Sequence, residues 1–115
     1  MKDEYCLVVT TFSAKENGKK IIDSLLRERL AACVQVMPIQ SFYPWQDTIH
    51  CDAEQLVLIK TTRSLYTRVE ESILAQHSYD IPEILLLPIE DGFSGYLDWI
   101  SQVCTPGPPI GSQPA

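Results

Sequence analysis

The sequence has 115 residues, fewer than one average domain, so a single domain without a second catalytic lobe is expected. Hydrophobic residues make up 45% and charged residues 21%, a balance typical of globular proteins rather than of disordered chains. Acidic residues outnumber basic ones by 15 to 9, and the resulting net charge of -6 repels phosphate groups. This composition argues against nucleic acid or an anionic membrane surface as the main partner.

The four cysteines, Cys6, Cys33, Cys51 and Cys104, are too far apart to form a C-x-x-C half-site for zinc or redox chemistry. The first residues include acids where a signal peptide requires basic side chains, and the apolar run that follows is short. A cytoplasmic protein with reduced cysteines is therefore expected.

Strands and helices alternate along the predicted chain. An apolar run over 5–12 predicts a strand, and apolar residues at helical spacing over 21–30 predict a helix after it. The later elements are expected as strands over 32–43 and 49–62, a helix over 65–76, a strand over 83–89, and a helix over 94–103.

Local signals mark the boundaries of these elements. Ser13 and Glu16 have the spacing of a capping box at the start of the first helix, and Ser94 is a candidate cap for the last. Residues 46–48 predict a turn between two long strands, the second of which is expected to be interrupted around Asp52.

This order of elements is that of an α+β, ferredoxin-like βαββαβ sandwich with an extra C-terminal helix. Such a fold has a four-stranded antiparallel sheet with two helices on one face. The domain is expected to span residues 1–104. Residues 105–115 hold four of the eight prolines and two of the five glycines and carry no charge, so they are expected to form a tail.

The predicted strands are apolar on both faces, although one sheet face of this fold is usually in water. Val57 and Ile59 alternate with Leu56 and Leu58, and residues 84–87 are all apolar. A strand over 32–43 would be about 40 Å long, roughly twice the usual length. We therefore predict an obligate homo-oligomer that packs through sheet faces and hairpin edges, with a monomer exposing an apolar sheet as the alternative.

The sequence offers little catalytic chemistry. It contains two histidines, His50 and His77, and no nucleophile elbow, glycine-rich phosphate loop or H-E-x-x-H motif, so an enzyme is not expected. His77 follows the predicted second helix and precedes Pro82 and Glu83. A neutral imidazole at this place can bind copper or zinc, while a histidine that caps the helix C-terminus is the simpler interpretation.

A second group of candidate residues lies on the long hairpin and the last helix. Trp45 suits either a ligand pocket or an interface between chains, and Lys60 suits either an anion site or an intersubunit ion pair with Glu54. The candidates for an intersubunit cleft are Tyr43, Trp45, Glu54, Lys60, Tyr96 and Trp99.

Five short motifs follow one another along the chain: Leu-Ala-Ala-Cys-Val at 30–34, Ser-Phe-Tyr-Pro-Trp at 41–45, Glu54 with Lys60-Thr61, His-Ser-Tyr-Asp-Ile-Pro-Glu-Ile at 77–84, and Tyr-Leu-x-Trp-Ile at 96–100. Together, and in this order over residues 5–104, they resemble the divalent-cation tolerance (CutA) family. The resemblance implies a ferredoxin-like protomer in a tight homotrimer, similar in architecture to PII signalling proteins. It also implies a cytoplasmic protein linked to tolerance of copper and other divalent cations, without established enzymatic activity or an organic cofactor.

The copper ligands implied by the family are a cysteine at the end of the first strand and two adjacent histidines. Thr10, Gln76 and His77 occupy these positions here, so one ligand of three is present. Ser78 stands where the family has proline, and Asp47 where it often has glycine. The leading hypothesis is a trimer that binds a divalent metal weakly, through His77 with Glu83 or with a neighbouring chain.

Two other hypotheses remain. The first is a PII-like regulatory module whose intersubunit clefts, lined by Trp45, Lys60 and Glu83, hold a small anionic molecule. The second, a small ferredoxin-like enzyme, lacks a nucleophile and base pair that the sequence can name.

Overall fold

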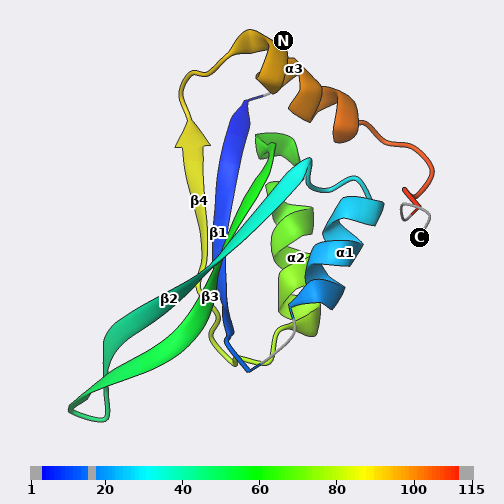
Figure 1. Ribbon diagram of the computed structural model, residues 1–115. Helices are drawn as coiled ribbons and strands as arrows, with labels where there is room; N and C mark the ends of the chain where they lie inside the picture. Colours follow the sequence, from blue (N-terminus) through cyan, green and yellow to red (C-terminus); the bar gives the residue numbers. More distant parts are fainter. Residues whose placement is uncertain (1–3, 16–17, 112–115) are drawn as a thin grey trace.

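The computed structural model describes residues 4–15 and 18–111, which form one antiparallel sheet and three helices (Figure 1). The strands are β1 (Tyr5–Ser13), β2 (Cys33–Trp45), β3 (Thr48–Thr62) and β4 (Ile84–Ile89). The helices are α1 (Lys19–Arg27), α2 (Tyr66–Gln76), which follows a short 3-10 turn at Arg63–Leu65, and α3 (Ser94–Val103). The strand order is β2-β3-β1-β4, so the ferredoxin-like α+β prediction is confirmed.

The core lies between the sheet and the helix pair α1 and α2, which cover one face (Figure 1). Val8 of β1 is the antiparallel partner of Ile59 in β3, and both side chains are fully buried. Leu25 of α1 and Ile73 of α2 are buried against this pair of strands. Each helix therefore buries the apolar stripe that its sequence period predicts.

The opposite sheet face has little cover from the described part of this chain. Helix α3 lies across one end of the sheet (Figure 1), where Tyr5 and Ser101 share a hydrogen bond of 2.6 Å between their hydroxyl groups. Farther along, Leu85 and Leu87 of β4 are 54% and 44% exposed, and Met37 of β2 is 44% exposed. Within the described residues, the two-faced apolar pattern of the strands thus leaves an open apolar face.

The hairpin of β2 and β3 extends beyond the rest of the sheet (Figure 1). Strand β1 ends opposite Glu54, so residues 40–53 form a two-stranded ribbon with which no third strand of the described residues pairs. Its turn residues Gln46 and Asp47 have φ angles of 50° and 62°, as a type I′ turn requires. The expected interruption at Asp52 is wrong, because Asp52 pairs with Ser41 within the ladder and its side chain is exposed rather than buried.

Both predicted helix caps differ from the structure. Ser13 is the last residue of β1, and α1 begins at Lys19 after Gly18, without a side-chain cap; Glu16 of the predicted box lies outside the described residues. Gly18 is required by packing, since a Cβ atom there would lie 2.3 Å from Cδ2 of Phe12. Ser94 is the first residue of α3 rather than its cap, which is Phe93.

The described part of the C-terminal tail, residues 105–111, lies against the end of α1. The Ile110 N–H donates to the Arg27 carbonyl oxygen at 3.0 Å, and Nη1 of Arg27 donates to the Ile110 carbonyl oxygen at 2.9 Å. Nε of Arg29 donates to the Pro108 carbonyl oxygen at 3.1 Å. These contacts hold a segment that belongs to no helix or strand.

Candidate functional site

His77 lies where α2 ends, and its ring is held by both nitrogen atoms. Its backbone turns to an extended conformation (φ -76°, ψ 141°), which ends the helix. Nε2 lies 2.7 Å from the Thr11 carbonyl oxygen, and the Tyr79 N–H donates to Nδ1 at 3.0 Å. Because a carbonyl oxygen only accepts, Nε2 carries the proton and Nδ1 is the acceptor, which defines one neutral tautomer.

Aromatic rings surround this histidine on two sides. The centroid of the Phe12 ring is 5.1 Å from that of His77, and the Tyr79 ring is 4.8 Å away on another side. The Tyr79 hydroxyl donates to Oε2 of Glu54 in β3 at 2.8 Å. The loop after α2 is thereby tied to β1 through His77 and to β3 through Tyr79.

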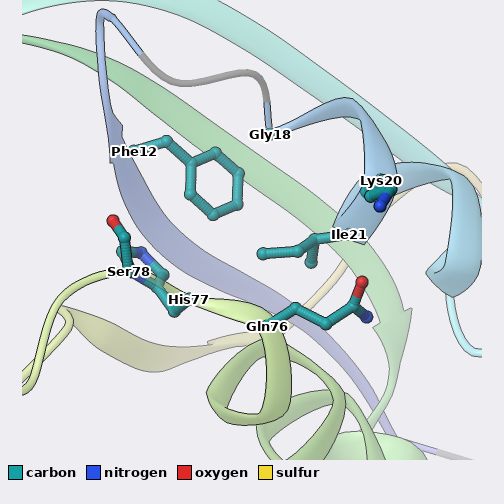
Figure 2. A pocket seen from close by; sticks show the side chains of 7 residues that line it. All are labelled: Phe12, Gly18, Lys20, Ile21, Gln76, His77 and Ser78. Carbon is teal, nitrogen blue, oxygen red and sulfur yellow. The ribbon is translucent and has the colours of Figure 1, made fainter.

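A cavity of about 310 Å³ lies beside His77, between the start of α1 and the end of α2. Figure 2 shows Phe12 and Ser78 on one side of it and Lys20 and Gln76 on the other. The lining combines one cationic side chain, one amide, one hydroxyl and aromatic surface, so the cavity is suited to a small polar molecule.

The predicted copper ligands do not combine into a metal centre in one chain. Thr10 is fully buried, and its hydroxyl oxygen has no hydrogen-bond partner among the described residues. Glu83 is exposed just before β4. Across residues 4–15 and 18–111, no three His, Cys, Asp or Glu side chains are grouped so that they could hold a metal ion.

Three of the predicted cleft residues come together on the sheet end that α3 covers. Nζ of Lys60 lies 3.3 Å from the Tyr96 hydroxyl oxygen and 5.3 Å from the centre of its ring, a cation–π distance. The Trp99 ring is 5.5 Å from that of Tyr96 and tilted by 31°. The Lys60 ammonium group and the Tyr96 and Trp99 rings therefore place a positive charge next to aromatic surface.

The other cleft candidates lie elsewhere in the chain. Tyr43 stacks on His50 at 5.9 Å, and its hydroxyl donates to the Asp52 carboxylate, which raises the pKa of Tyr43. Trp45 lies beside the hairpin turn and is 60% exposed, while Glu54 accepts the bond from Tyr79. One protomer therefore does not gather the six candidates into a single cleft.

Sequence reasoning missed the parts of the His77 site that come from distant segments. The Thr11 carbonyl oxygen that contacts His77 belongs to a residue 66 positions earlier, and every residue has such an oxygen, so the sequence does not indicate this contact. From the sequence, Phe12 is predicted only as part of an apolar strand. Tyr79 was part of the motif that contains His77, and its spacing of two residues could have indicated a contact across the loop.

The fold is shared with solved structures of proteins that carry one family name. The structure titled as CutA1 from Oryza sativa superposes with a TM-score of 0.83 at 40% identity, covering 88% of this chain and 94% of that one. The structure titled as a periplasmic divalent cation tolerance protein CutA from Archaeoglobus fulgidus gives a TM-score of 0.84 at 34% identity, covering 88% and 99%.

The chain belongs to the CutA1 divalent ion tolerance protein family, whose model matches residues 6–103. It is 40% identical over 97 residues to the divalent-cation tolerance protein CutA of Thermus thermophilus, which spans 84% of this chain and 94% of that protein. It is also 42% identical over 95 residues to the chloroplastic protein CutA of Arabidopsis thaliana, spanning 82% of this chain. The chain matches 52% of the length of that plant relative.

Proposed function

We propose that this chain acts in divalent-cation tolerance as a cytoplasmic homotrimer without catalytic activity of its own. The observation that carries this proposal is the family match over 6–103, together with relatives named for that function at 35–40% identity. None of the helices in the described ranges has the length and apolar character needed to cross a membrane.

The metal contact that we propose is weak and shared between chains. The residues of one protomer do not fit the copper pattern, since Thr10 replaces a thiol and both ring nitrogens of His77 are already hydrogen-bonded. Binding a cation such as copper at His77 must break one of these bonds, which opposes binding by about 1 kcal/mol. His77 and Glu83 then need further donors from a neighbouring chain.

Titration calorimetry with copper tests this assignment on the intact protein. The wild type should give weak, saturable heat that His77→Ala and Glu83→Gln both reduce. His50→Ala removes the other histidine of the sequence and should bind like the wild type. Circular dichroism confirms that the variants are folded. Identical isotherms for wild type and His77→Ala would remove His77 from the metal account.

The homotrimer is supported by the open apolar face and by the exposed ribbon. Phe42 and Ile49, on the ribbon, are 68% and 73% exposed, and the open sheet face adds Leu85 and Leu87. Single chains rarely leave contiguous apolar surface of this kind in water. Light scattering coupled to size exclusion should give three chain masses, and a folded species of one chain mass would refute the assembly.

A PII-like module that binds a small anion is the second candidate function. The observation that favours it is Lys60, whose ammonium group lies beside the Tyr96 ring, which in turn packs against Trp99, so that an anion with an aromatic group has a cation and aromatic surface close together. ATP and citrate are suitable probes. They should raise the melting temperature of the wild type and not that of Lys60→Gln, whereas copper should act equally on both.

A further inference from the structure

A second cavity, of about 470 Å³, lies at the end of the sheet where β1 begins and β4 ends, next to α3. It is lined by a different set of residues from the His77 cavity, which lies toward the other end of β1. Its volume is within the range of about 300–1,000 Å³ that is usual for small-molecule sites. This cavity takes no part in the function proposed above.

Charges of both signs line this cavity. Arg63 supplies a guanidinium, and Glu4, Glu90 and Asp91 supply carboxylates. Among the described residues, the one ion pair within 4.0 Å joins Arg27 to Asp23, so Arg63 is not paired with any of these three carboxylates. The Arg63 main-chain N–H donates to the Glu4 carbonyl oxygen at 2.7 Å, which fixes its backbone and leaves its side chain unpaired with Glu4.

The cavity also has apolar lining. Leu97 of α3 and Tyr5 contribute to it, and the Tyr5 hydroxyl is already bonded to Ser101. Cys6 forms part of the same lining. Burial raises the pKa of the Cys6 thiol to about 11, and the positive charge of Arg63 acts against this rise, which is consistent with a guanidinium close to the cavity.

We propose that this cavity binds a small zwitterion with an apolar side chain, namely a free α-amino acid. Arg63 would receive the carboxylate through paired N–H donors, while the carboxylates of Glu90 and Asp91 would receive the ammonium group. The side chain would lie against Leu97. A ligand of this class carries both charges that the lining can pair and an apolar side chain that Leu97 can contact.

The same lining disfavours the simpler ligands. A small anion would be drawn to Arg63 but repelled by three carboxylates. A bare metal cation would be repelled by Arg63, and the described carboxylates are not grouped closely enough to hold one. The Asp91 carboxylate accepts a hydrogen bond of 2.8 Å from the Gly92 N–H, which holds this carboxylate in place at the edge of the cavity.

Calorimetry with three matched probes tests the proposal. L-leucine carries both charges, 4-methylpentanoate lacks the ammonium group, and 3-methylbutylamine lacks the carboxylate. Leucine should bind saturably, and each partial probe should bind about tenfold more weakly or worse, because each lacks one of the two charge-assisted contacts. Equal binding of all three probes, or absence of leucine binding, would overturn the proposal.

Matched variants locate the binding at this cavity. Arg63→Gln keeps the main-chain hydrogen bond and should reduce leucine binding about tenfold or more, and Glu90→Gln should reduce it as well. Arg68→Gln removes an exposed arginine of α2 that does not line the cavity and should bind like the wild type. Wild-type affinity in folded Arg63→Gln would refute the site, while the copper and oligomer results would stand unchanged.

Discussion

Thr10 offers a sharp stability test, because its hydroxyl group is fully buried and has no hydrogen-bond partner among the described residues. Its neighbours across the sheet are Val57 and Ile84, which are apolar. A buried hydroxyl without a partner destabilises the fold by about 1–3 kcal/mol, and valine has nearly the same shape. Thr10→Val is therefore expected to raise the free energy of unfolding by about 1–2 kcal/mol.

Thr61 provides the matched control on β3. It is also fully buried, but its hydroxyl donates to the Leu30 carbonyl oxygen at 2.6 Å. Thr61→Val leaves that carbonyl group without this donor and should lower the free energy of unfolding by about 1–2 kcal/mol. The same chemical change is thus expected to have opposite signs at Thr10 and Thr61.

Urea unfolding followed by circular dichroism measures both effects. All proteins must be compared at one chain concentration, because the stability of an oligomer depends on concentration. Equal slopes against urea would show that the unfolded states are comparable. If Thr10→Val is destabilised as much as Thr61→Val, the Thr10 hydroxyl has a bonded partner and the reasoning fails.

Three further predictions concern the turn, the tail and a buried thiol. Asp47→Gly should stabilise the fold by up to about 1 kcal/mol in urea unfolding, because glycine adopts a φ of 62° without steric cost; a loss of stability would contradict this. Removal of residues 105–115 should speed hydrogen exchange at the C-terminal end of α1 without unfolding the sheet, and unchanged exchange would show that the tail contacts add nothing. Cys6, whose pKa burial raises to about 11, should resist iodoacetamide at mildly alkaline pH until the protein is unfolded, since the thiolate is the reactive form; alkylation of Cys6 in the folded protein would refute this.

The order of strands and helices could be predicted from the sequence because each element carries a long hydrophobic pattern. The predicted helix over 65–76 agrees within one residue with α2, and the predicted strand over 83–89 agrees within one residue with β4. The turn at 46–48 is also predicted correctly, but its type depends on the positive φ angles of Gln46 and Asp47, neither of which is glycine. Boundaries set by caps are the weaker predictions, since β1 extends through Ser13 and α1 begins only at Lys19.

The site could be predicted only in part. His77 was correctly placed at the end of a helix, since helical periodicity stops just before it. The bond from its ring to the Thr11 carbonyl oxygen depends on how α2 packs against β1, which spacing alone does not encode. The contact between Lys60 and Tyr96 likewise arises from the way α3 crosses the sheet end.

The contacts of the tail with Arg27 and Arg29 have a consequence for how this segment can change during evolution. Each arginine donates to main-chain carbonyl oxygens of the tail, and such oxygens are present whatever the side chain. Substitutions in the tail should therefore accumulate freely while the segment keeps its position. At Gly107 a Cβ atom would lie 3.3 Å from Nε of Arg29, so a larger residue there needs a small shift of that side chain. Sequence drift in this segment would accordingly be a poor guide to whether it is structurally attached.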